Sequence, residues 1–110
     1  MMIKITGAEV TRWQGSQHPT TSLITRMMEK EGMRAYAWNG TPNKQFPTTS
    51  NNFHRIVYIV AGSVEVNLPD ENHRYTLKTG DRLIVPAGIR YSLVVGPQGA
   101  ECLEAAVKRI

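Results

Sequence analysis

Turns recur at intervals of about 8 to 12 residues through the second half of the chain, and each follows a short apolar segment. The turn signals are Ala61–Ser63, Pro69–Asn72, Pro86–Gly88 and Gly96–Gly99. The segments between them are rich in valine, isoleucine, leucine and tyrosine, which are common in β-strands. Short strands at regular spacing are typical of an antiparallel sandwich or barrel, so the chain is predicted to be all-β.

One helical segment precedes most of the strands. Residues 18–32 place Leu23, Ile24, Met27 and Met28 on one apolar stripe, as in a helix with one buried face. Pro19 or the threonines after it favour its start, and Gly32 favours its end. We expect this helix to pack on the outside of the barrel. The predicted strands are 2–6, 33–40, 53–60, 64–68, 73–80, 81–85, 91–95 and 101–110, and residues 41–52 are predicted to be a loop or an irregular edge.

Composition limits the class of protein. The chain has 110 residues, of which 41% are hydrophobic and 20% charged, which predicts a single globular domain, residues 1–110. We expect no membrane span and no signal peptide, because no sufficiently long apolar run occurs. The single cysteine, Cys102, fits a cytoplasmic protein. The net charge is +4, but the basic residues are scattered, so neither nucleic acid nor a membrane is an expected partner.

The hairpin in the last third of the chain carries the spacing of a known motif. Gly80, Pro86 and Gly88 stand at three of its fixed positions, and Asp81 follows the first glycine. Gly62 stands where a second motif of the same family ends. On these residues the chain resembles a small single-domain cupin of the RmlC-like type. The resemblance implies a jelly-roll, or double-stranded β-helix, barrel with one short N-terminal helix.

The positions that hold a metal in other cupins carry different residues here. Arginine cannot be a metal ligand, because it has no acceptor and stays protonated. Hydroxyl and amide side chains are weaker ligands for such a metal than imidazole is. The comparison therefore implies a cupin with no metal and no other cofactor. The replaced positions are Thr49 and Asn51 (or, on the other spacing, Thr48 and Ser50), Arg55 and Tyr91; Val95 also replaces the asparagine that ends the motif.

The resemblance also implies which strand face lines the barrel. Strand alternation puts Asn51 and Arg55 on one face, and the hairpin motif of Gly80, Pro86 and Gly88 brings Tyr91 to the same lumen. A buried guanidinium needs a partner. We hypothesise that the partner is a small anionic ligand held by Arg55. Tyr91 would donate a hydrogen bond beside it, and Asn51, Thr49 and Glu104 complete the candidate site.

An alternative partner for Arg55 lies in the chain itself. The last strand carries Glu101 and Glu104 on opposite faces, and the sequence leaves open which of them points inward. A pair between Arg55 and either glutamate would be an inert buried ion pair in a filled barrel. Cys102 lies between apolar residues, as a core cysteine does.

Catalysis is the other functional alternative. Some cupins are metal-dependent oxygenases or isomerases, and some metal-free cupins are epimerases that use a histidine and a tyrosine. Tyr91 is a candidate acid, and Glu104 is a candidate partner in proton transfer. The sequence places no histidine in the lumen, so the enzymatic alternative stays open.

We expect a homodimer, from the resemblance and because symmetric dimers are the commonest oligomers. Trp13, Tyr36 and Trp38 suit an interface, where aromatic residues are enriched. They suit a core or lumen position equally well.

Overall fold

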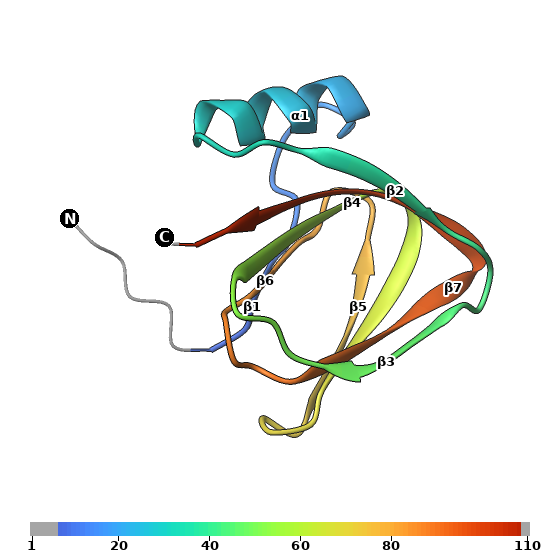
Figure 1. Ribbon diagram of the computed structural model, residues 1–110. Coiled ribbons are helices and arrows are strands. Elements are labelled where there is room, and N and C mark those ends of the chain that lie inside the picture. The colour runs from blue at the N-terminus through green and yellow to red at the C-terminus, as the bar shows by residue number, and fades with distance from the viewer. Residues whose placement is uncertain (1–6, 109–110) are drawn as a thin grey trace.

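The computed structural model describes residues 7–108, in which a curved antiparallel sheet wraps around a central core (Figure 1). Its strand order is β1-β6-β4-β7-β2, with β3 beside β7 and β5 beside β4. The prediction of an all-β jelly roll is confirmed, whereas the strand predicted at residues 2–6 lies outside the described residues. The elements are β1 (Glu9–Thr11), α1 (Thr21–Lys30), β2 (Tyr36–Gly40), β3 (Gln45–Thr49), β4 (His54–Leu68), β5 (His73–Lys78), β6 (Arg82–Val85) and β7 (Tyr91–Val107).

Two long strands, β4 and β7, run through both walls of the barrel. The first half of β4 pairs with β6 and with the end of β7, and its second half pairs with β5 and with the start of β7. The turns predicted at 61–63 and 96–99 are therefore wrong, because β4 and β7 are continuous there. Gly62 and Gly99 take positive φ angles, and shifts of the β4–β7 register surround Gly62. Such irregularities bend a strand without ending its ladder.

Strand alternation separates two apolar clusters. Val57 and Ile59 of β4 face the lumen, where they pack with Leu93 and Val95 of β7. The intervening residues of β4 face outward and pack against the helix, because successive side chains of a strand point to opposite faces. The predicted position of the helix outside the barrel is confirmed. The outer cluster consists of Ile24, Met28, Met33, Ile56, Tyr58, Ile84, Leu103 and Ala105.

Helix α1 begins and ends where its sequence signals lie. The Oγ1 of Thr20 accepts a hydrogen bond from the backbone N–H of Leu23 at 3.2 Å, which caps the first turn. Gly32 follows the last turn with a φ of 78°, a conformation that favours glycine. No helix in residues 7–108 is long and apolar enough to cross a membrane.

The segment after β2 is an irregular edge, as predicted. Within it, β3 is exposed along its whole length, and its pairing with β7 shifts register between Phe46 and Thr49. The strand pattern does not predict β1, a strand of three residues that pairs with β6.

Gly62→Ala is expected to destabilise the protein strongly. An added Cβ would lie 2.0 Å from the carbonyl oxygen of Gly99, at a φ of 78°. Gly88 is a matched control, because its φ is 86° and a Cβ there meets open space. We expect Gly88→Ala to cost about 1–2 kcal/mol of unfolding free energy, and Gly62→Ala to cost about 1–3 kcal/mol more. Urea unfolding measures both, and equal losses would contradict this account of the bend.

Candidate functional site

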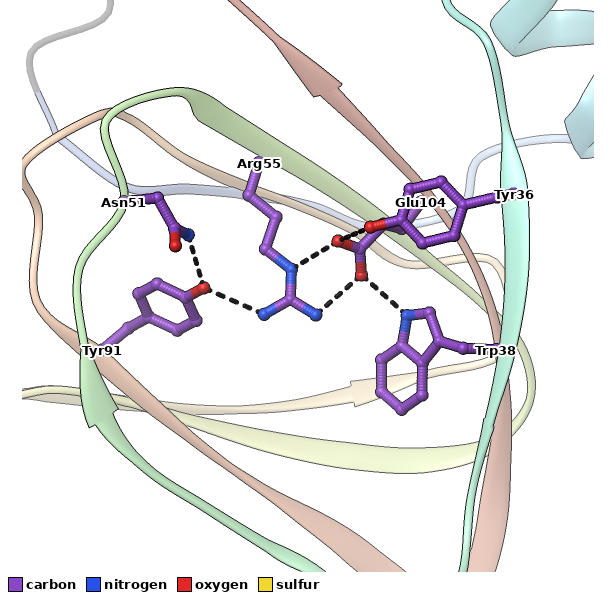
Figure 2. A network of polar contacts seen from close by, with 6 residues as sticks. All are labelled: Tyr36, Trp38, Asn51, Arg55, Tyr91 and Glu104. Carbon is purple, nitrogen blue, oxygen red and sulfur yellow. Dashed lines mark hydrogen bonds and ion pairs between the residues drawn. The ribbon is translucent and has the colours of Figure 1, made fainter.

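Arg55 reaches the mouth of the barrel from the inner face of β4. It lies on the same side of the strand as Val57 and Ile59, which belong to the lumen core. Its guanidinium stands above that core, and 18% of the side chain is exposed. Figure 2 shows it between side chains that converge from β2 and from the two ends of β7.

Glu104 is the counter-charge of Arg55 and is the internal partner that the sequence offered as the alternative to a ligand. Nε donates to Oε2 at 2.8 Å, and Nη2 donates to Oε1 at 2.6 Å, a bidentate pair. Burial alone lowers the pKa of Arg55, but the hydrogen bonds and the charge of Glu104 outweigh it, so the pKa is raised. The structure thus selects Glu104 from the two candidate glutamates: its side chain is 5% exposed, whereas Glu101 is exposed.

Two aromatic side chains of β2 complete the coordination of Glu104. The hydroxyl of Tyr36 donates to Oε2 at 2.6 Å, and the indole Nε1 of Trp38 donates to Oε1 at 2.7 Å. Burial, followed by the hydrogen bond to Glu104 and its charge, raises the pKa of Tyr36 to about 12. With Arg55, the carboxylate accepts four hydrogen bonds, which is about its full capacity. Glu104 therefore has no free lone pair with which to act as a base.

Tyr91 lies on the other side of the guanidinium. Its oxygen accepts hydrogen bonds from Arg55 Nη1 at 2.9 Å and from Asn51 Nδ2 at 2.7 Å. The backbone of Asn51 is itself held in place, because its carbonyl accepts the N–H of Gly88 at 2.8 Å. Since the tyrosine oxygen already accepts twice, its own hydrogen remains to donate to a further group.

Four of the five predicted site residues come together in this network. The fifth, Thr49, is exposed, and its Oγ1 donates to the carbonyl of Ser50 at 3.4 Å. The sequence did not assign Tyr36 and Trp38 to the site. Their alternation with Ala35 and Ala37 indicated that they share one face, but only the pairing of β2 with β7 places Tyr36 opposite Glu104. The residues that form the network are Tyr36, Trp38, Asn51, Arg55, Tyr91 and Glu104 (Figure 2).

Partly exposed aromatic side chains lie on the inner face of the sheet beside the network. Tyr36 is 52% exposed and Phe46 is 37% exposed, although both pair with inward-facing residues of β7. The ring of Phe46 meets Trp38 edge-on, with centroids 5.8 Å apart. Arg55 lies 6.0 Å from the Trp38 ring centroid and 5.6 Å from that of Tyr91. The charged group thus sits within an aromatic rim, which we define as Tyr36, Trp38 and Phe46.

A cupin-type metal does not fit these side chains. The inward positions carry an arginine, a tyrosine and an asparagine, and the nearby carboxylate is filled by donors. A guanidinium has no lone pair for a metal and repels it. His54 lies outside the network, where its Nδ1 accepts the N–H of Ala87 at 3.1 Å. Within residues 7–108, no three His, Cys, Asp or Glu side chains form a group that could hold a metal ion.

The chain belongs to the EutQ-like cupin domain family, whose family model matches residues 28–109. The recognition of a small cupin from its glycine, aspartate and proline spacing is therefore confirmed. A search of curated proteins found no significant match.

Solved structures with similar folds include an enzyme and proteins of unknown function. The chain is 25% identical to the polyketide cyclase RemF of Streptomyces resistomycificus, with a TM-score of 0.60, over 68% of this chain and 54% of RemF. It thus spans about half of that enzyme. A DUF861 family protein from Thermotoga maritima is 17% identical over 90% of this chain and 98% of its own, with a TM-score of 0.59. A conserved protein of unknown function from Streptococcus pyogenes is 16% identical over 99% and 81%, with a TM-score of 0.60. The last two show the fold alone.

Glu104→Gln is expected to destabilise the protein by about 3–5 kcal/mol, because it leaves the charge of Arg55 without a partner. Glu101→Gln is the matched control on the same strand, since Glu101 is exposed, and we expect a change within about 0.5 kcal/mol. Chemical denaturation measures both variants. Similar stabilities for the two variants would show that the ion pair does not support the barrel.

Cys102 is expected to be unreactive in the folded protein. Burial, with a further contribution from the charge of Glu104, raises its pKa from 9.0 to about 12, and the thiolate is the reactive form. The folded state holds this proton where the unfolded state has lost it, so stability should fall as the pH rises from about 9 to about 12. A thiol reagent at pH 8 should modify urea-unfolded protein at once and folded protein only slowly. Fast labelling of the folded protein would contradict the buried position.

Proposed function

We propose that this cupin binds a small molecule at the mouth of its barrel without a metal, and that the ligand presents a carboxylate to Arg55 and Tyr91. The observation that carries the proposal is the hydrogen-bond network around Arg55, in which one N–H on each Nη nitrogen has no partner in the part of the chain that the structure describes.

The far end of the guanidinium has free donors. Glu104 accepts hydrogen bonds from Nε–H and from one N–H of Nη2, and the oxygen of Tyr91 accepts one from Nη1. Figure 2 shows these partners approaching from opposite sides. One N–H on each Nη nitrogen therefore has no partner among residues 7–108. Two parallel N–H groups match the two oxygens of a carboxylate, and the free O–H of Tyr91 lies beside them.

The side chains around Arg55 favour a small ligand with an apolar body. The lumen beneath Arg55 is filled by buried side chains such as Val57, Leu93 and Val95, so a ligand would lie over the ion pair rather than deep in the barrel. The aromatic rim offers ring faces and edges for apolar contact. An apolar surround with a few convergent polar groups is the usual composition of a small-molecule site.

Binding is better supported than catalysis. Glu104 accepts four hydrogen bonds, which leaves Tyr91 without an adjacent base. A proton-transfer enzyme needs a group that can take the proton. The likeness to RemF supports a small-molecule site in this barrel type, because a polyketide cyclase acts on an organic small molecule.

Benzoate and its neutral analogue benzamide test the proposal. The chain has two tryptophans, so the indole N–H of Trp38 is a resolved NMR reporter of the mouth. We expect benzoate to shift this signal saturably and to bind more tightly than benzamide. Tyr91→Phe should weaken benzoate by roughly tenfold, the effect of about 1–1.5 kcal/mol for one lost hydrogen bond.

Tyr75→Phe is the matched control, because Tyr75 of β5 lies outside the network and should leave binding unchanged. No saturable shift with either compound would overturn the proposed binding function. Equal affinity for the two compounds would overturn the assignment of a carboxylate as the ligand group.

A further inference from the structure

A cavity lies outside the barrel, between α1, β6 and the segment that follows β1. Its volume is about 500 Å³. Apolar and aromatic side chains make much of its wall, and three cations (Arg12, Lys30 and Arg82) and one carboxylate (Glu31) lie among them. None of its lining residues belongs to the network around Arg55. Its lining includes Trp13, Gly80, Met27, Lys30, Glu31 and Arg82.

The wall formed by Trp13 depends on the Gly80-Asp81 pair of the cupin motif. A Cβ on Gly80 would lie 2.6 Å from the Cβ of Trp13, so only glycine leaves room for this side chain. Asp81 fixes the segment from its buried position: it accepts the guanidinium of Arg12 at 2.6 Å and the backbone N–H of Trp13 at 3.4 Å. The indole N–H of Trp13 donates to the carbonyl of Gln17 at 3.0 Å. The aromatic wall is therefore held in place from several sides.

Arg82 supplies a cation with few partners. Its Nε is buried and makes no hydrogen bond within residues 7–108. Its Nη2 donates to Thr11 Oγ1 at a long 3.4 Å, and Nη1 lies 3.9 Å from Glu31 Oε1, beyond hydrogen-bond distance. Arg55, by contrast, has a carboxylate at 2.6 Å. A partly buried guanidinium without a close counter-charge gains from a bound anion.

We propose that this outer cavity binds a small anion with a flat apolar body, such as an aromatic carboxylate. The body would lie against Trp13 and Met27, and the carboxylate would face Arg82 and Lys30. Arg12 is paired with Asp81 at 2.6 Å, and the two other lining cations, Lys30 and Arg82, outweigh the single lining carboxylate of Glu31. The charge of the cavity therefore complements that of the ligand. This site is separate from the barrel mouth and does not depend on the function proposed for it.

NMR titration of the whole chain with 2-naphthoate and with the neutral 2-naphthylmethanol tests the proposal. We expect naphthoate to shift the indole N–H of Trp13 and the amide of Gly80 saturably. The alcohol should bind about tenfold more weakly, because it lacks the charge-assisted hydrogen bonds. Arg82→Gln should weaken naphthoate by about tenfold, whereas Arg74→Gln, an exposed arginine of β5, should leave it unchanged.

The comparison of the two compounds uses the unaltered protein, so it decides the question even if Arg82→Gln fails to fold. Equal affinities would overturn the proposal of an anion site. Shifts confined to the indole N–H of Trp38 would place binding at the barrel mouth and overturn the outer site. The absence of any saturable shift would overturn it as well. If naphthoate no longer shifts the Trp38 signal in Tyr91→Phe but still shifts the signals of Trp13 and Gly80, that result would support an outer site that is separate from the barrel mouth.

Discussion

The charge of Arg55 is the constraint around which the mouth of the barrel is arranged. A guanidinium largely withdrawn from water needs a counter-charge and acceptors in fixed directions, or it destabilises the fold. Glu104 provides the charge, and Tyr36 and Trp38 fill the acceptor positions that Arg55 leaves on it. Tyr91 receives the opposite side of the guanidinium. One charge thus links β2, β4 and β7, the strands that enclose the opening.

Much of this arrangement follows from the two-residue period of a strand. Arg55 had to share a face with Val57 and Ile59, and that face proved to be the lumen. The same reasoning placed Cys102 and Glu104 on one side of the last strand. It could not say which side points inward, because the direction depends on how β7 pairs with β4 after its bend near Gly99.

Other features could not be predicted from the sequence, because they too depend on how distant segments pair. Glycine favours turns and bends alike, so Gly62 and the glycines of residues 96–99 predict turns. Only the continuous strands β4 and β7 show that the chain bends there instead. The aromatic partners of Glu104 required knowledge of a pairing between distant strands. The outer cavity arises where Trp13 packs on Gly80, and neither residue signals the other in the sequence.

The pairing of β2 with β7 also affects how the protein forms. Tyr36 and Glu104 are 68 residues apart in the chain, and Arg12 and Asp81 are 69 apart. Chains that depend on such distant contacts fold slowly, because long loops must close before the contacts form. During synthesis β4 emerges well before β7. Until β7 pairs with it, the charge of Arg55 has no counter-charge and the apolar lumen face of β4 is exposed to water. The pairing of β7 with β4 therefore completes both the core and the candidate site.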